Sequence, residues 1–200
     1  MKKTANSFIP VAVLIIVYVL SGCQYDYDSP LPGTLDVRLK SQVTDTSLFN
    51  PQNQNNFVLK VNTVEAIRSD FVRATVYEDP SSIKRSPRTY NVYDVRARDS
   101  SLVIGESPLP PGEYISVNLE IVPGPSVVRD GYRIINVKRV AGFSPILRFQ
   151  KPFSVEEQGT TTIVVTVDLD STLVPGVDFA SKEDIYYFKP YYYISSINNH

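Results

Sequence analysis

The sequence holds few of the residues on which most catalytic and metal sites depend. Its 200 residues include one histidine, one cysteine, one methionine and no tryptophan. The histidine is the final residue, His200, and chain ends usually fray. We therefore expect neither a histidine-based catalytic triad nor a multi-histidine metal site. The single cysteine, Cys23, excludes a disulfide framework within the chain.

The chain also lacks a charge excess. Its 20 basic and 21 acidic residues leave a formal net charge of −1, and no glycine-rich phosphate-binding loop is present. Nucleic-acid binding would require a clear basic excess, so we expect no nucleic-acid partner. Hydrophobic residues make up 42% of the sequence, which argues for one folded domain with a substantial core.

The first 23 residues have the pattern of a secretory signal. Lys2 and Lys3 form a basic head, and residues 11–20 form an apolar run that ends in Leu20-Ser-Gly-Cys23. Ten residues rise only about 15 Å as a helix, roughly half of the hydrocarbon core of a bilayer. The pattern therefore predicts a signal peptide over residues 1–22. An uncleaved anchor, or a cleaved signal with an incidental cysteine, is the alternative.

Leu20-Ser-Gly-Cys23 resembles the lipoprotein box of bacteria. The resemblance implies that the Cys23 thiol receives a diacylglycerol, that the chain is cut before it, and that the new N-terminus is acylated, with palmitate as a typical chain. Beyond this covalent lipid and the calcium ion considered below, we expect no cofactor. Gln24 after the cysteine resembles the pattern of lipoproteins sent to the outer membrane, on its periplasmic or its cell-surface face. Residues 23–32 would then be a lipidated tether.

Beyond the tether, apolar residues recur with a period of two. Leu35, Val37 and Leu39 alternate with polar residues, which is typical of a strand with one buried face. The same reasoning predicts strands at 57–67, 71–77, 89–95, 101–104, 114–122, 132–138, 146–149, 160–169 and 185–194. Residues 48–56 and 174–184 are expected to be loops, and Pro123-Gly-Pro125 is expected to end a strand. The sequence therefore predicts an all-β antiparallel sandwich of about eight to ten strands over 33–197.

Four short motifs resemble a known family. They are GTLDVRL at 33–39, LPPGEY at 109–114, TTTIVVTVDLD at 160–170 and YFKP at 187–190. Together they resemble a family of uncharacterised bacterial lipoprotein domains with a transthyretin-like (prealbumin-like) β-sandwich. The resemblance implies a fold and a place in the cell envelope, and it supplies no catalytic residues.

The segment IYYFKPYYYI, residues 185–194, has six aromatic residues among ten. In one extended strand Tyr187, Lys189, Tyr191 and Tyr193 would share a face, and lysine is rarely buried, so this face is predicted to be exposed. Such tyrosines can stack on sugar rings or contact a partner protein. They can equally form aromatic pairs across strands. Pro190 has no N–H for a ladder, which favours the edge of a sheet.

Three carboxylates are candidates for a calcium site. Asp168 and Asp170 point the same way on an extended chain, and Asp178 follows. Carboxylate oxygens are the ligands that Ca²⁺ prefers. The same residues are equally good turn formers, so both interpretations stay open.

These observations predict a lipid-anchored envelope protein whose β-sandwich is a non-catalytic binding or assembly module. Its partners would be the membrane, through the anchor, and a glycan or an envelope protein. An alternative is a structural anchor subunit of a surface fibre or adhesive assembly. A carbohydrate-active enzyme that uses paired carboxylates is a third hypothesis.

Overall fold

The computed structural model describes residues 29–44, 56–78, 88–94, 100–129 and 131–200. Residues Leu31–His200 form one compact unit, and the text below concerns that unit. The expected signal peptide, Cys23 and nearly all of the expected loop at 48–56 lie outside the described residues.

The described part of the chain is built from strands and one helical turn, α3 (Leu169–Thr172). The strands are β1 (Gly33–Gln42), β2 (Asn56–Arg68), β3 (Arg73–Glu78), β4 (Arg88–Asn91), β5 (Leu102–Leu109), β6 (Gly112–Arg129), β7 (Arg133–Arg139), β8 (Ile146–Phe149), β9 (Phe153–Val155), β10 (Thr160–Asp168), β11 (Leu173–Val177), β12 (Asp184–Phe188) and β13 (Tyr192–Asn199).

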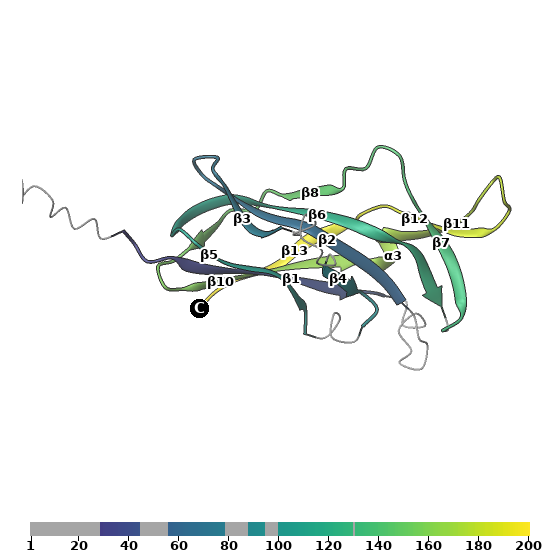
Figure 1. The fold of residues 1–200 in the computed structure, drawn as a ribbon, viewed down its shortest axis with the longest axis horizontal. Helices are drawn as coiled ribbons and strands as arrows, with labels where there is room; N and C mark the ends of the chain where they lie inside the picture. Colours follow the sequence, from purple (N-terminus) through teal and green to yellow (C-terminus); the bar gives the residue numbers. More distant parts are fainter. Residues whose placement is uncertain (1–28, 45–55, 79–87, 95–99, 130) are drawn as a thin grey trace, which may run out of the picture. The chain divides into compact units, whose positions relative to one another are not determined.

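The strands form two layers (Figure 1). One sheet has the order β13-β10-β1-β5. The other has the order β11-β12-β7-β6-β2-β3, with β4 paired to β2 and with β8 and β9 paired to β6. The predicted all-β, sandwich-like class is confirmed. The prediction of purely antiparallel sheets is wrong, because β1 pairs with β10, and β12 with β7, in parallel.

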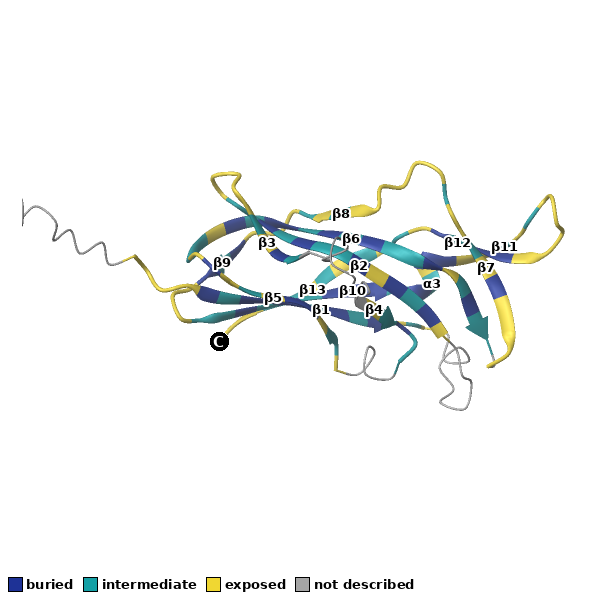
Figure 2. Ribbon diagram, viewed as in Figure 1, coloured by how far each residue is buried: buried dark blue, intermediate teal, exposed yellow. Residues whose placement is uncertain are grey.

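The core lies between the two sheets, as the buried bands along the strands show (Figure 2). The predicted alternation in β1 is confirmed, since Leu35, Val37 and Leu39 are fully buried. The β-branched residues Ile163 and Val165 of β10 are buried beside them, because β10 is the parallel neighbour of β1. An apolar period of two therefore places each of these strands with one face on the core.

β6 continues where the sequence predicted an end. Leu59 of β2 pairs with Pro123 and Phe57 pairs with Val127, so between these pairs one residue of β2 lies opposite three of β6. A β-bulge absorbs the extra residues, and proline is tolerated there because it has no ladder hydrogen bond to lose. A Cβ on Gly124 would lie 2.9 Å from the carbonyl oxygen of Val58, so this position requires glycine.

The start of β6 contains a second correction. Strict alternation along 114–122 predicts that Tyr114 lies on the polar face, opposite to Val117 and Leu119, but Tyr114 is fully buried. A register shift between β2 and β6 next to Arg68 changes which face the side chains occupy. Tyr114 stacks on Phe153 at 5.2 Å between ring centroids, and its hydroxyl donates to the carbonyl oxygen of Pro110 at 2.8 Å.

The expected loop at 174–184 is partly a strand. β11 pairs with β12 along its whole length, from Leu173 with Phe188 to Val177 with Asp184. Pro175 and Gly176 are typical of loops, so the sequence did not predict this strand, although proline is compatible with an edge strand. β11 is indeed the last strand of its sheet.

Candidate functional site

The aromatic segment 185–194 does not form a single strand. Its first half is β12, in the sheet that also contains β6, and its second half begins β13, in the other sheet. Lys189, Pro190 and Tyr191 connect the two sheets. The backbone N–H of Lys189 donates to the carbonyl oxygen of Thr172, and that of Tyr191 donates to the Thr172 hydroxyl. Thr172 thus provides acceptors for two backbone N–H groups that have no strand partner in this connection.

The four residues of the predicted stacking face are therefore divided. Tyr187 belongs to β12, and its ring packs so closely over Gly176 that a Cβ there would lie 2.6 Å from it. Tyr193 belongs to β13, where its hydroxyl donates to the Gln42 side chain at 2.5 Å. Lys189 and Tyr191 are exposed in the connection between them. The expectation of one continuous face is wrong, because the chain changes sheets at Pro190.

The expected edge position is correct for only one half. β13 is the end strand of its sheet, whereas β12 lies between β11 and β7. A strand with neighbours on both sides cannot offer its backbone to a partner. Tyr187 therefore has a packing role. Of the three tyrosines in the predicted stacking face, only Tyr191 and Tyr193 are exposed.

The three candidate calcium ligands each have a local partner. Asp168 caps α3 by accepting from the backbone N–H of Ser171. Asp170 accepts from the backbone N–H of Thr44 at 2.6 Å, and Asp178 forms an ion pair with Lys138 at 2.5 Å. Within the described ranges, no group of three or more histidine, cysteine or acidic residues is placed to hold a metal ion.

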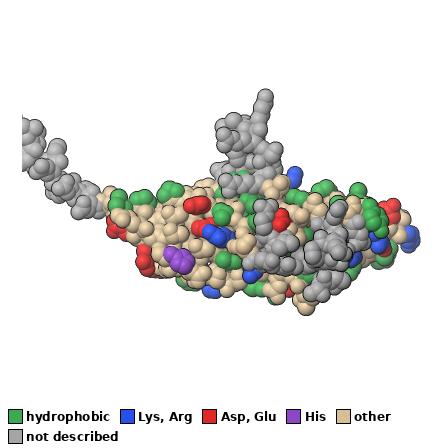
Figure 3. Space-filling model, turned by 90° about the horizontal axis from the view of Figure 1, so that it is seen from below, with side chains coloured by type: hydrophobic (Ala, Val, Ile, Leu, Met, Phe, Trp, Pro, Cys, Tyr) green, Lys and Arg blue, Asp and Glu red, His purple; other side chains and the backbone are tan. Residues whose placement is uncertain are grey.

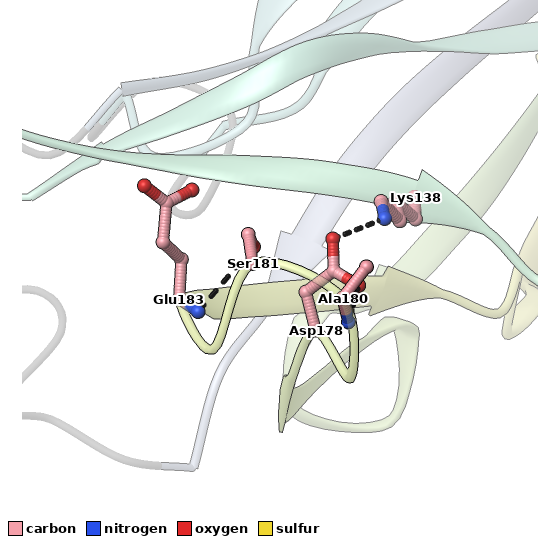
Figure 4. A network of polar contacts seen from close by, with 5 residues as sticks. All are labelled: Lys138, Asp178, Ala180, Ser181 and Glu183. Atoms are coloured by element: carbon pink, nitrogen blue, oxygen red, sulfur yellow. Dashed lines mark hydrogen bonds and ion pairs between the residues drawn. The ribbon is translucent and has the colours of Figure 1, made fainter.

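The turn between β11 and β12 shows how Asp178 is used (Figure 4). Its carboxylate accepts from Lys138 of β7 and from the backbone N–H of Ala180 at 3.2 Å. The hydrogen bond from Lys138 is the main cause that lowers the pKa of Asp178, and the same bond raises the pKa of Lys138. Asp178 thus fastens the turn to the neighbouring strand.

A pocket lies where the end of β6 meets α3, β11 and β12. We call it the end pocket, and its volume is about 370 Å³. That volume is sufficient for a small ligand such as a sugar ring. The lining residues are Tyr93, Arg129, Leu169, Asp170, Leu173, Pro175 and Tyr186.

Arg129 supplies a cation to the end pocket. One of its terminal nitrogens, Nη1, donates to the hydroxyl of Tyr186 at 3.1 Å. Its Nε is buried and has no acceptor among the described residues. A buried donor without an acceptor is unfavourable, so a guanidinium in this state is suited to a ligand that brings an oxygen.

The arrangement of the end pocket suits binding more than reaction. Arg129 and Asp170 provide a donor and an acceptor group, and the rings of Tyr93 and Tyr186 provide apolar surface with polar tips. Sequence reasoning missed Arg129 because β6 was expected to end at Pro123. Had β6 been extended through the bulge, Arg129 would have been placed at its far end.

No helix in the part of the chain that the structure describes is long and apolar enough to cross a membrane. Comparison of the chain with protein-family models, with curated proteins and with solved structures finds no match. The end pocket therefore has to be interpreted from its own residues.

Proposed function

We propose that the chain is a lipid-anchored protein of the bacterial outer membrane whose β-sandwich binds a small ligand without catalysing a reaction. The basic head, the short apolar run and the sequence Leu20-Ser-Gly-Cys23 support the anchor. The resemblance to transthyretin-like lipoprotein domains supports the same location. The end pocket supports the binding role.

The observation that carries the binding role is Arg129. Its guanidinium lines a pocket of about 370 Å³ that also contains two tyrosines, and its buried Nε has no acceptor among the described residues. A glycan with a carboxylate, such as a uronic acid, would offer this guanidinium an anionic acceptor. The sugar ring would lie against Tyr186 or Tyr93. An acidic sugar is therefore the ligand class that these residues fit best.

Calorimetric titration of the mature chain with acidic and neutral oligosaccharides tests this proposal. We expect acidic sugars to bind and Arg129→Met to lose most of the binding, because methionine keeps the apolar stem but removes the donors. Arg148→Met is the matched control, since Arg148 is exposed on β8. Equal binding by the wild type and Arg129→Met, or no binding of any acidic sugar, would contradict the proposal.

Membrane attachment has its own test. Replacement of Cys23 by serine removes the only thiol to which a lipid could be attached. We expect the Cys23→Ser chain to move from the membrane fraction to the soluble fraction. Retention of this variant in the membrane fraction would show that the chain is held by something other than a lipid on Cys23.

A second candidate function is assembly. β13 is an end strand, and among the described strands it pairs with β10 alone. An unpaired edge can accept a strand from another molecule, as a subunit of a surface fibre would require. Sedimentation velocity over a range of concentrations would reveal self-assembly through this edge. A monomer at every concentration would exclude it.

A further inference from the structure

The turn between β2 and β3 exposes two apolar side chains. Phe71 is 78% exposed and Val72 is 54% exposed. They are adjacent in sequence at the tip of a hairpin (Figure 1). Single exposed apolar residues are common on protein surfaces, so their exposure alone does not indicate a function.

The backbone makes Phe71 unusual. The residue has a φ angle of 65°, in the left-handed region. The turn closes through hydrogen bonds from the Phe71 N–H to the Arg68 carbonyl at 2.9 Å and from the Arg68 N–H to the Val72 carbonyl at 3.0 Å. Glycine is the favoured residue at such a hairpin position, and a bulky residue is disfavoured. The fold alone therefore gives no reason for a phenylalanine at this position. A role for its exposed side chain would give one.

The turn lies at the end of the unit where the chain enters. The N–H of Ser69 donates to the carbonyl oxygen of Glu113, and Glu113 pairs with Ser154 of β9. The segment that follows β9 contacts the start of the unit, since the N–H of Leu31 donates to the side chain of Glu157 at 2.8 Å. The turn, β9 and the start of the unit therefore lie at the same end (Figure 2).

This end faces the membrane if Cys23 carries a lipid, so the inference rests on the proposed function. Residues 23–30 connect the anchor to the compact unit, and eight residues span at most about 28 Å. We propose that Phe71 and Val72 insert into the interfacial layer of the bilayer that holds the anchor. An aromatic and a branched apolar side chain at a hairpin tip suit that layer.

The contact is apolar rather than electrostatic. Both arginines that flank the tip have acidic neighbours, Arg68 with Asp70 at 3.6 Å and Arg73 with Glu65 at 3.9 Å. Acidic and apolar side chains also lie at the entry end of the face seen in Figure 3. We therefore expect insertion into zwitterionic lipid, with little dependence on salt. Two side chains hold weakly by themselves, so the contact requires the tether.

The absence of tryptophan makes the test direct. In the Phe71→Trp variant the tryptophan at the tip is the only one in the protein. The mature chain, residues 23–200, would be coupled through its single thiol at Cys23 to a maleimide lipid in phosphatidylcholine vesicles. Because this coupling replaces lipidation in the cell, its result does not depend on whether the cell lipidates Cys23.

Phe179→Trp is the matched control. Phe179 is 86% exposed in the turn between β11 and β12, beyond the far end of β6 (Figure 1). We expect Phe71→Trp to shift its emission to shorter wavelength on coupling and to be quenched by brominated lipids. We expect neither change for Phe179→Trp. In the Phe71→Trp background, Val72→Ser should reduce the quenching.

Three outcomes would overturn the proposal. The first is an unchanged Phe71→Trp emission that stays open to an aqueous quencher. The second is equal quenching of both tryptophans by brominated lipid. The third is an emission shift that depends on the density of protein on the vesicles and is not accompanied by quenching from brominated lipid. That result would show that the tip contacts a second copy of the chain. Phe71→Gly guards against a folding artefact: if the phenylalanine is not needed for folding, this variant should be at least as stable in urea as the wild type.

Discussion

The two halves of the aromatic segment 185–194 have similar composition and different roles. In the first half, Tyr186 and Phe188 are 9% and 4% exposed. In the second half, Tyr191 and Tyr193 are 53% and 37% exposed. The first half is β12, with β11 and β7 on its two sides, and the second half starts β13, with β10 on one side. Tyr186 and Phe188, in the strand with two neighbours, therefore pack in the core, whereas Tyr191 in the connection and Tyr193 in the edge strand project to the surface.

This comparison predicts its largest effect at Phe188. Its ring packs against Phe57 at 6.3 Å between centroids, so Phe188→Ala would leave a cavity between the sheets. We expect Phe188→Ala to lower the free energy of unfolding by about 3–5 kcal/mol. Urea denaturation followed by circular dichroism would measure the loss.

The matched control is Tyr191→Ala in the exposed half. Because Tyr191 projects largely into solvent, we expect this substitution to change the free energy of unfolding by less than about 1 kcal/mol. If the two substitutions destabilise the protein equally, the two halves do not differ as the structure indicates.

The sequence predicts the strands whose side chains alternate without interruption. β2 and β10 lie within one residue of their expected ranges, because an apolar period of two is a local signal. The position of a β-bulge depends on the partner strand, so it cannot be predicted from the alternation of one strand. The bulge at Pro123 and the register shift near Tyr114 depend on how β2 pairs with β6, and both reversed an expectation drawn from β6 alone.

The candidate site was less accessible to sequence reasoning. Arguments from strand periodicity placed Tyr187 and Tyr193 on one face, and they failed because the chain changes sheets between them. The end pocket combines Tyr93, Arg129 and Tyr186 from segments far apart in the sequence. Only the pairing of whole strands brings such residues together, and no spacing in the sequence reports it.

A smaller effect is expected at Tyr192, where the exposed half meets the core. Its hydroxyl is buried and has no hydrogen-bond partner among the described residues. Burial also raises the pKa of Tyr192, so the phenol stays neutral when exposed tyrosines ionise. We expect Tyr192→Phe to raise the free energy of unfolding by about 1 kcal/mol, because it removes an unsatisfied polar group. A lower midpoint in urea would instead reveal a partner for this hydroxyl.

Tyr193, one residue further along β13, should respond in the opposite direction. Its hydroxyl donates to Gln42, and both residues are exposed. We expect Tyr193→Phe to lower the free energy of unfolding by about 0.5 kcal/mol, since water partly replaces such a bond. The same urea experiment compares Tyr192→Phe and Tyr193→Phe directly. A change of the same sign in both would remove the distinction between the buried and the exposed tyrosine.

The smallest effect concerns the ion pair beside β12, for which we find no counterpart in the described part of β13. The hydrogen bond with Lys138 lowers the pKa of Asp178 below its ordinary 3.8 in the folded protein. The stabilisation by this carboxylate is therefore fully present above that value and is lost as the pH falls through the folded pKa. The pKa of Lys138 is raised above 10.5, so its contribution is present below that value and is lost at higher pH.

Asp178→Asn tests this sign. The difference in unfolding free energy between the wild type and the variant should be small, because solvent screens the pair. It should be constant near neutral pH and should vanish as the pH falls through the lowered pKa of Asp178. Asp184→Asn, which removes the exposed partner of Arg133 at the start of the same strand, is the control. A difference that grows as the pH falls would show that Asp178 is destabilising when charged, and that the turn is not fastened to β7 by Lys138.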